Sequence, residues 1–487
     1  MSITMLVYPV FCVLVLGALI LQFTASKTQQ QIASGNNPHF KKFQYSFFLV
    51  YFMALFSDWL QGPYVYKLYS HYGYASNQIA LLYVVGFASS VVFGTTTGPI
   101  ADRFGRKKMA LAFCLIYSFC CLTKLSSSFF WLFLGRVFGG ISTSMLFSTF
   151  ESWYVYEHTE THDFPSEWIS VTLSKATFWN GLLAINAGIF ANVVAETLHF
   201  GPVAPFMFAI PFLLLSGIII AKTWPENYGN TANNLRHSCM EGLRTIIFKE
   251  EILYLGIVQS LFEANMYIFV FQWTPILDEH NDTPLGMVFA SFMVCIMVGS
   301  SLYAILLHKK VSEAKLLTLA VIMAMVSMAI CVLTSGNSSL KSITYAAFLL
   351  LEVSVGMYFP SIGYLRSQVI PEELRAGIMN WFRVPMNILT CSGLLLLHNQ
   401  TMISNTESMF AICTIMLAVA LVSSMRFSKL FSVVSVAADV LAHSDEKRPL
   451  NIDADDEETD YGFAIVHGKR ENSPPTADKL SHLVVHK

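Results

Sequence analysis

The sequence "GPIADRFGRKKMA", from Gly98 to Ala110, lies between two long apolar runs. It gathers one acid and four bases in a short polar stretch, as expected for a loop between two membrane-spanning helices. Gly98 predicts a close approach of helices, and Gly105 predicts a tight turn. Asp102 is placed to pair with a base or to cap a helix end.

Composition points to a membrane protein. Of the 487 residues, 54% are hydrophobic and 13% are charged, whereas soluble domains are about 25% charged. The net charge of −2 argues against a nucleic-acid partner. Nine cysteines lack Cys-x-x-Cys or metal-ligand spacing, so we expect no disulfide framework and no metal site. Catalytic and cofactor motifs are missing from the sequence, so we expect neither an enzyme nor a cofactor.

Thirteen apolar stretches are long enough to span a membrane, since a helical span needs about 20 residues. They cover residues 5–24, 43–66, 78–99, 108–125, 128–152, 169–195, 203–222, 251–275, 284–307, 314–335, 342–365, 375–398 and 408–431. The predicted fold class is therefore an all-α membrane protein. We expect five parts: an N-terminal helix and linker (1–42), a six-helix half (43–222), a central cytosolic loop (223–250), a second six-helix half (251–431) and a disordered acidic tail (432–487).

The first apolar stretch, 5–24, has two interpretations. A cleaved signal peptide begins with bases, but here the first bases, Lys27, Lys41 and Lys42, come after the apolar stretch. That order favours a retained helix with its N-terminus outside the cell.

The remaining bases test this orientation. With Lys27 in the cytosol, sixteen bases fall in cytosolic loops and three, Lys67, Lys124 and Lys341, fall in outside loops. Three glycosylation sequons, which begin at Asn281, Asn337 and Asn399, also fall in predicted outside loops. We therefore expect a multi-pass glycoprotein of the cell membrane with its C-terminus in the cytosol. Location in an internal membrane is the alternative.

The opening stretch resembles the loop signature of the major facilitator superfamily, G-x-x-x-D-R-x-G-R-[RK]. All of its defining positions are present: Gly98, Asp102, Arg103, Gly105, Arg106 and Lys107. The resemblance implies two six-helix halves that face each other around a central site, here with one extra N-terminal helix. We expect contacts of this loop to hold an inner gate shut and to break when the halves rock.

Two further stretches bear on the gate. "LFLGRVFGGIS" contains Arg136 and Gly140 at the spacing of a second, looser signature of the superfamily. "GSSLYAILLHKK", in the second half, keeps Gly299 and the pair Lys309 and Lys310 but lacks the acid. We therefore expect an asymmetric gate.

Seven charged residues fall inside the predicted spans. They are the bases Arg136, Lys175 and Arg383 and the acids Asp58, Glu151, Glu263 and Glu352. Each would cost roughly 3 kcal/mol at the bilayer centre, so these side chains must pair, be protonated or line a water-filled cavity. The resemblance implies a cavity lined by the first, fourth, seventh and tenth core helices, with the fifth and eleventh nearby.

Arg383, in "NWFRVPMN", is the first candidate to bind an oxyanion, because the arginine fork donates two parallel hydrogen bonds. Asn380, Trp381 and Asn387 add N–H donors nearby. The alternative is a buried ion pair between Arg383 and Glu352. The other candidate substrate-binding residues are Asn380, Lys175, Glu352, Glu263 and Asp58, and buried acids of this kind can also carry a coupling proton.

Longer stretches look like the molybdate-anion transporter family, among them "SDWLQGPYVYKLY", "FVFQWTPILD" and "VIPEELRAGIMNWFRVPMN". The resemblance covers the chain from the first helix to about residue 431 and implies uptake of molybdate. The residues alone do not select molybdate over sulfate, another tetrahedral dianion. A transporter of another solute, such as a sugar or an organic anion, and a non-transporting receptor or scaffold remain the alternatives.

Overall fold

The computed structural model describes residues 3–28, 37–165, 167–229, 235–279, 283–371, 374–398 and 406–446. Two helical groups follow one another along the chain, after an N-terminal helix α1 (Ile3–Thr28). The first group contains α2 (Pro38–Gln61), α3 (Val65–His71), α4 (Ser76–Phe104), α5 (Arg106–Thr123), α6 (Phe129–Tyr156), α7 (Glu167–Asn192) and α8 (Ala204–Thr223). The second contains α10 (Glu250–Leu277), α11 (Leu285–His308), α12 (Glu313–Thr334), α13 (Lys341–Val369), α14 (Arg375–His398) and α15 (Thr406–Glu446).

Each of the thirteen predicted spans coincides with one long helix. Among the described residues, ten helices are long and apolar enough to cross a membrane. The other three predicted spans coincide with α2, α5 and α14, which also contain charged residues, such as Asp58 in α2 and Arg383 in α14. Charged faces on helices of this length are expected for helices that border a polar interior.

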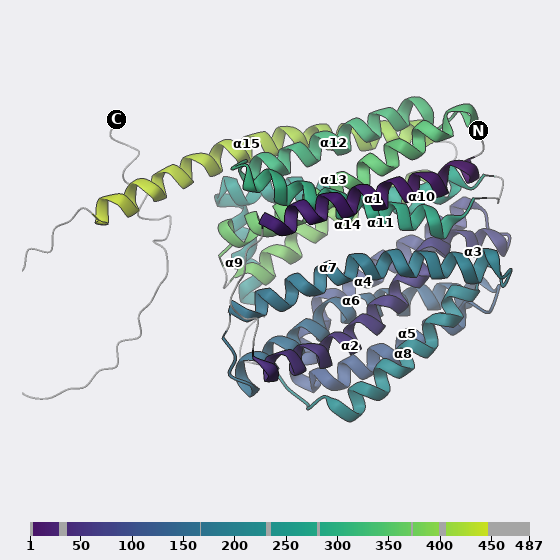
Figure 1. Ribbon diagram of the computed structural model, residues 1–487, viewed down its shortest axis with the longest axis horizontal. Helices are drawn as coiled ribbons and strands as arrows, with labels where there is room; N and C mark the ends of the chain where they lie inside the picture. Colours follow the sequence, from purple (N-terminus) through teal and green to yellow (C-terminus); the bar gives the residue numbers. More distant parts are fainter. Residues whose placement is uncertain are drawn as a thin grey trace, which may run out of the picture. The chain divides into compact units, whose positions relative to one another are not determined.

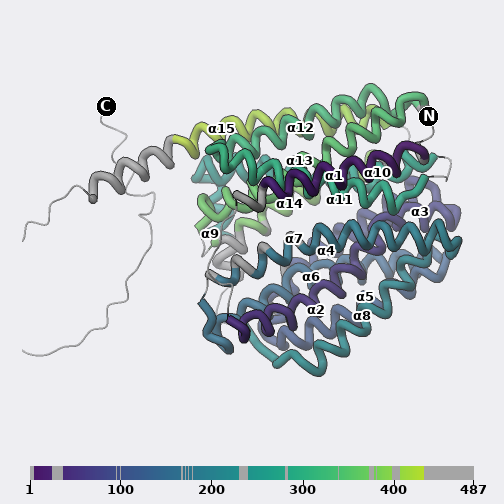
Figure 2. Tube along the Cα trace, viewed as in Figure 1, coloured from purple at the N-terminus to yellow at the C-terminus, as the bar shows by residue number. Residues whose placement is uncertain are grey.

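Packing groups the helices into two halves (Figure 1), and Figure 2 traces the chain through both. In the first half α4 packs on α6, α5 on α6 and α8, and α2 on α7 and α8. In the second half α13 packs on α11 and α12, and α10 packs on α14. The halves meet where α7 packs on α11 and α4 packs on α14.

Small residues permit the closest approach between the halves. A Cβ added to Gly188 of α7 would lie 2.8 Å from the carbonyl oxygen of Gly286, and one added to Gly286 of α11 would lie 2.3 Å from that of Gly188. Neither position accommodates a side chain, so the two helix backbones touch there.

Two features differ from the sequence prediction, and a third was not predicted. A short helix, α9 (Leu235–Phe248), lies within the predicted central loop and packs on α14 and α10. Helix α15 continues past Phe431, the expected end of the last span, to Glu446. The N-terminal helix α1 packs on α11, where the side-chain oxygen of Gln22 accepts a hydrogen bond from Ser301 at 2.9 Å.

The chain divides into two compact units, Met1–Val434 and Ser435–Lys487. The first unit holds both helical halves. In the second unit the described residues form the end of α15, to Glu446. We call the end of the bundle that carries Gly105 the motif end, and the end that carries Lys67 the distal end.

Candidate functional site

A cluster of charged and hydroxyl groups lies inside the second half, on α10, α13 and α14. The hydroxyl of Tyr358 donates to Oε1 of Glu263 at 3.0 Å. Arg366 and Arg383 lie within electrostatic range of the same carboxylate. Neither arginine forms an ion pair with Glu263 among the described residues, but the three together carry two positive charges and one negative charge.

Arg366 was not predicted to belong to this cluster, because the base count assigned it to a cytosolic loop. It lies in the last turn of α13, and its guanidinium donates to Oε1 of Gln259 at 3.4 Å. The amide of Gln259 also hydrogen-bonds Glu263. A long arginine side chain at a helix end can turn back into the bundle, and position along the sequence does not reveal this.

Arg383 is exposed on α14. Asn387 is predicted to add an N–H donor for the anion, but the structure contradicts this. Its amide is buried and donates to the carbonyl oxygen of Arg383 at 2.6 Å. The side chain of Asn380 lies outside the described residues. Within the described residues Arg383 forms no ion pair with Glu352. The alternative prediction of a buried Arg383–Glu352 pair is therefore wrong.

Glu352 lies elsewhere in the second half. It is buried in α13 within electrostatic range of Cys295 of α11. One turn further along α13, a Cβ at Gly356 would lie 2.1 Å from the carbonyl oxygen of Ile296, so α11 and α13 touch here. Gly299 belongs to the same close contact between α11 and α13. It therefore serves helix packing and not the gate loop that we predicted.

The predicted base of the first half, Lys175, also has polar neighbours. Its ammonium group donates to Oε1 of Gln44 on α2 at 3.1 Å, while Nε2 of Gln44 donates to the hydroxyl of Thr172 at 2.8 Å. The Tyr154 hydroxyl completes the chain by donating to Thr172 at 2.6 Å. Lys175 itself is exposed, so its charge is available to a ligand.

Two other predicted charges of the first half, Asp58 and Arg136, tie helices together. Asp58 of α2 accepts a hydrogen bond from the hydroxyl of Tyr117 on α5. Nε of Arg136 donates to the carbonyl oxygen of Leu82 at 3.0 Å, and its guanidinium lies 4.8 Å from the ring centre of Tyr83. Arg136 thereby joins α6 to α4.

Gly140 serves the same contact between α6 and α4. A Cβ at Gly140 would lie 2.5 Å from the carbonyl oxygen of Gly86. The two residues of the second signature, Arg136 and Gly140, therefore act together in packing α6 against α4.

The distal end is closed by an ion pair and by aromatic rings. Nζ of Lys67, which follows α2, lies 3.2 Å from Oδ2 of Asp278 at the end of α10. It also lies 3.1 Å from Oε1 of Glu196. The pair with Asp278 joins the first half to the second, whereas the pair with Glu196 stays within the first half.

One face of α10 shows how far this closure extends. Phe271 packs edge-on against Tyr66 and Tyr83, with ring centres 5.5 and 5.2 Å apart. One turn nearer the motif end, Tyr267 packs edge-on against Phe87 at 4.9 Å. Glu263 is next on this face, at the i, i+4 spacing that aligns side chains on a helix. The charged cluster therefore lies directly beneath the aromatic closure.

The motif loop makes its contacts within the first half. Gly105, at φ 110°, forms the turn between α4 and α5, as predicted. Asp102 accepts from Nε and Nη2 of Arg106 at 2.9 and 2.7 Å. The backbone N–H of Lys107 donates to Oε1 of Glu226 at 2.8 Å. The loop is thereby fastened to the segment that follows α8.

The prediction for Gly98 was wrong, because nothing lies within 4 Å of a Cβ built there. Arg103 is exposed, with its guanidinium 5.7 Å from the ring centre of Phe104. In this conformation neither residue holds the two halves together.

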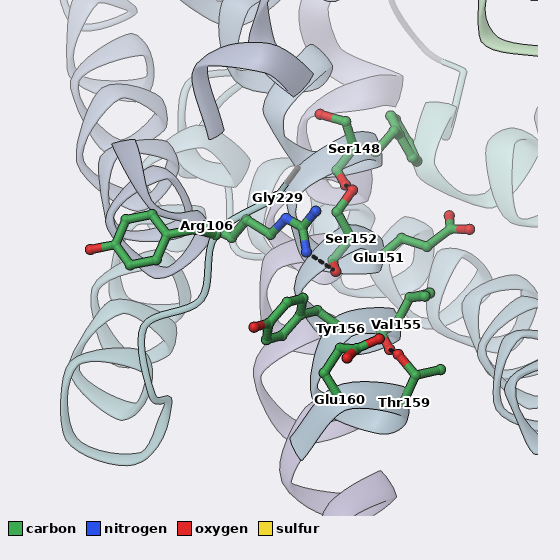
Figure 3. A pocket seen from close by; sticks show the side chains of 11 residues that line it. Arg106, Ser148, Glu151, Ser152, Val155, Tyr156, Thr159, Glu160 and Gly229 are labelled. Carbon is green, nitrogen blue, oxygen red and sulfur yellow. Dashed lines mark hydrogen bonds between the residues drawn. The ribbon is translucent and has the colours of Figure 1, made fainter. Parts of the chain in front are cut away.

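A cavity of about 690 Å³ opens beside the motif loop, at the motif end of α6. Figure 3 shows Arg106 pointing toward Ser152, to whose carbonyl oxygen Nη1 donates at 3.0 Å. Glu151, the fourth acid of the predicted spans, is exposed and lines this cavity. All residues that line this cavity belong to the first half or to the segment that follows α8.

Three bases were predicted in loops of the distal end, and two of them are ion-paired there. Lys67 pairs as described above, and Lys341 pairs with Glu279. Lys124 lies in the turn after α5, as predicted, but it is buried and its ammonium group donates to the hydroxyl of Tyr69 at 2.8 Å. Of the three sequons, Asn337 is exposed in a loop at this end, whereas Asn281 and Asn399 lie outside the described residues.

Comparison with known proteins agrees with this arrangement. Residues 6–353 match the MFS_5 family model, described as sugar transporters with 12 TM. The chain belongs to this major facilitator family. It is a multi-pass membrane transporter and not an enzyme.

Relatives within the family are close in sequence and length. The chain is 43% identical over 435 residues to the molybdate-anion transporter of Xenopus tropicalis, a match that covers 88% of the chain and 95% of the relative. It is 43% identical over 455 residues to the molybdate-anion transporter of Takifugu rubripes, covering 86% and 95%.

Solved structures share the fold at low identity. The nucleoside transporter NupG superposes with a TM-score of 0.62 at 11% identity, over 80% of this chain and all of that one. A bacterial homologue of the lysosomal transporter Spinster, inward-facing and unoccupied, gives a TM-score of 0.60 at 14% identity, over 81% and 99%. These likenesses establish the major facilitator fold and say nothing of substrate.

Proposed function

We propose that this chain takes up molybdate across a membrane by alternating access. The observation that carries the proposal is the 43% identity to a molybdate-anion transporter along 95% of that relative's length. The cluster of the second half supports it, because two arginines beside one acid leave a net positive charge for a dianion.

Arg383 and Arg366 are the residues we assign to the oxyanion. An arginine fork donates two parallel hydrogen bonds to oxygens of one tetrahedral anion, which a lysine cannot do. Glu263 holds Tyr358 and Gln259 in place and repels the anion, so that binding is reversible. Lys175, exposed on α7 in the first half, is the partner we expect from the opposite wall.

Alternating access requires that one end close while the other opens. Here the distal end is closed by Lys67, Asp278 and the rings around Phe271. The motif loop bonds within the first half. We propose that this is the state that releases anion at the motif end, and that the motif loop meets the second half only in the opposite state.

Our proposal for the orientation of the chain in the membrane rests on the bases and sequons counted in the sequence. We propose that the motif end faces the cytosol, the distal end faces outside, and α1 is retained as a thirteenth span with its N-terminus outside. The exposed Asn337 supports this, because its sequon lies at the distal end. Loss of a glycan-dependent mass shift in Asn337→Gln would support the orientation, and a glycan on a sequon introduced beside Lys309 would contradict it.

Glu263 is the acid we assign to a coupling proton. Both arginines of the cluster act electrostatically on its carboxylate, so protonation would raise the local positive charge as the anion arrives. Glu263→Gln should then remove the dependence of uptake on a pH gradient while uptake driven by the molybdate gradient persists. Unchanged dependence on the pH gradient would exclude this assignment.

Uptake in cells tests the function. Cells that express the chain should accumulate labelled molybdate, and unlabelled tungstate should compete because it has the same shape and charge. The family model describes sugar transporters, so glucose is the second substrate to test. Accumulation of glucose without molybdate would replace the anion proposal by the sugar alternative, and no flux of either would favour a receptor or scaffold.

A further inference from the structure

A groove of about 300 Å³ opens between α12 and α15 at the motif end, away from the charged cluster. Two lysines line the groove. Lys315 lies near the start of α12, and Lys429 lies on α15 shortly before the first unit ends at Val434. The two helices run in opposite directions, so these lysines come from different parts of the chain to one end of the groove. Neither forms an ion pair with any residue that the structure describes.

The rest of the groove is apolar. Leu319 and Ile322 line it from α12, and Met425 lines it from α15. These side chains are 38%, 38% and 51% exposed, although they are large and hydrophobic. They lie one to two turns from the lysines, toward the middle of each helix, so charge and apolar surface are ordered along the groove.

Polar contacts define the floor of the groove. The hydroxyls of Thr318 and Ser424 lie 2.6 Å apart and join α12 to α15. The acid of the first turn of α12, Glu313, acts on Tyr303 and Tyr364, which belong to α11 and α13. Glu313 is not among the residues that line the groove, and no described acid does so.

We propose that this groove binds one anionic glycerophospholipid, with its phosphate between Lys315 and Lys429 and an acyl chain along Leu319, Ile322 and Met425. A basic pocket between membrane helices matches an anionic headgroup, and an adjoining exposed apolar strip matches a hydrocarbon chain. A soluble anion would leave the strip uncovered, and a neutral lipid would leave both lysines without a partner. With the motif end in the cytosol, the lipid belongs to the inner leaflet.

Native mass spectrometry of the purified full-length chain tests this proposal. Phosphatidylserine should be retained in preference to phosphatidylcholine with the same acyl chains. Each basic residue near an anionic surface contributes about 1 kcal/mol, so Lys315→Gln with Lys429→Gln should lower this preference about thirtyfold. Lys315→Arg with Lys429→Arg should keep the preference, which separates loss of charge from loss of folding.

The matched control is Lys222→Gln with Lys309→Gln, two exposed lysines at the same end but outside the groove. This control should change the preference by less than about threefold, since only general surface charge is altered. Equal retention of the two lipids by the parent, or an equal loss in the control, would overturn the proposal. Displacement of phosphatidylserine by an equal concentration of soluble glycerophosphoserine would also overturn it, because the acyl chain would then contribute nothing.

Discussion

Replacing Lys67 by methionine should open the distal end. The ion pair to Asp278 joins the halves at 3.2 Å, and its gross Coulomb energy at an effective dielectric constant of 20 is about 5 kcal/mol. The pair with Glu196 stays within the first half and does not distinguish the closed from the open state. After desolvation is subtracted, a charge-assisted contact is worth about 1.5–3 kcal/mol, so the ratio of closed to open molecules should fall about tenfold to 150-fold.

Labelling of a buried cysteine measures that ratio. Gln272 is buried and lines a cavity at the distal end, so Gln272→Cys reports opening to a membrane-impermeant maleimide. The labelling rate should rise with the open fraction in Lys67→Met and stay near the parent rate in Lys67→Arg. Lys341→Met is the matched control, because its ion pair with Glu279 lies at the same end but within the second half. A rate in Lys67→Met within about twofold of that control would refute the closure by this ion pair.

Three further predictions concern the two ends of the bundle. Asp102→Asn removes a charge-assisted contact with Arg106 worth about 1.5–3 kcal/mol, so uptake should slow at unchanged surface expression; a normal rate would contradict this. Gly105→Ala should lower the free energy of unfolding of the purified protein by about 1–3 kcal/mol, because φ is 110° and the new Cβ would lie 2.5 Å from Oε1 of Glu226. Gly98→Ala is the control and should have little effect on thermal unfolding, because its Cβ would lie in open space. Burial raises the pKa of Asp278 in the closed state, against the lowering effect of its lysine partner and of the Thr283 backbone N–H. The raised pKa means that burial of the Asp278 carboxylate costs more than its pair with Lys67 returns, although loss of Lys67 would leave that carboxylate without any compensation from a cation. Closing therefore takes up a proton, so closure should strengthen as pH falls and weaken as pH rises through that pKa. Labelling of Gln272→Cys should therefore slow on acidification relative to the same reporter in Asp278→Asn, and an identical pH profile in the two would disprove it.

The sequence predicted the helices and the motif turn well because both depend on local patterns. Runs of about 20 apolar residues predict spans, and a glycine between two helical runs predicts a turn, which Gly105 forms. Helix α9 was missed because its 14 residues are too short for a span and are rich in polar residues. Its stability depends on packing against α14, which no local pattern shows.

The candidate site was predicted only in part. Arg383 and Glu263 were identified because a charge within an apolar run is conspicuous. Arg366 was assigned to a loop but lies in the last turn of α13 and turns back to Gln259. Lys124 lies in a loop as predicted, but the burial of its side chain was not predicted. Counting bases locates a residue along the membrane normal, but the direction of its side chain depends on tertiary packing. Glu352 was paired with Arg383 because both lie within predicted spans. Depth in the membrane alone does not tell which neighbouring helix a side chain contacts.

Equilibrium binding of labelled molybdate to the purified chain tests the central claim most directly. The parent should bind molybdate saturably, with tungstate competing and glucose without effect. Arg383→Lys keeps the charge but loses the fork, so we expect affinity to fall about tenfold or more, the equivalent of one charge-assisted hydrogen bond of about 1.5 kcal/mol. Parent-like affinity in Arg383→Lys, Arg383→Gln and Arg366→Gln alike would contradict an oxyanion site at these arginines.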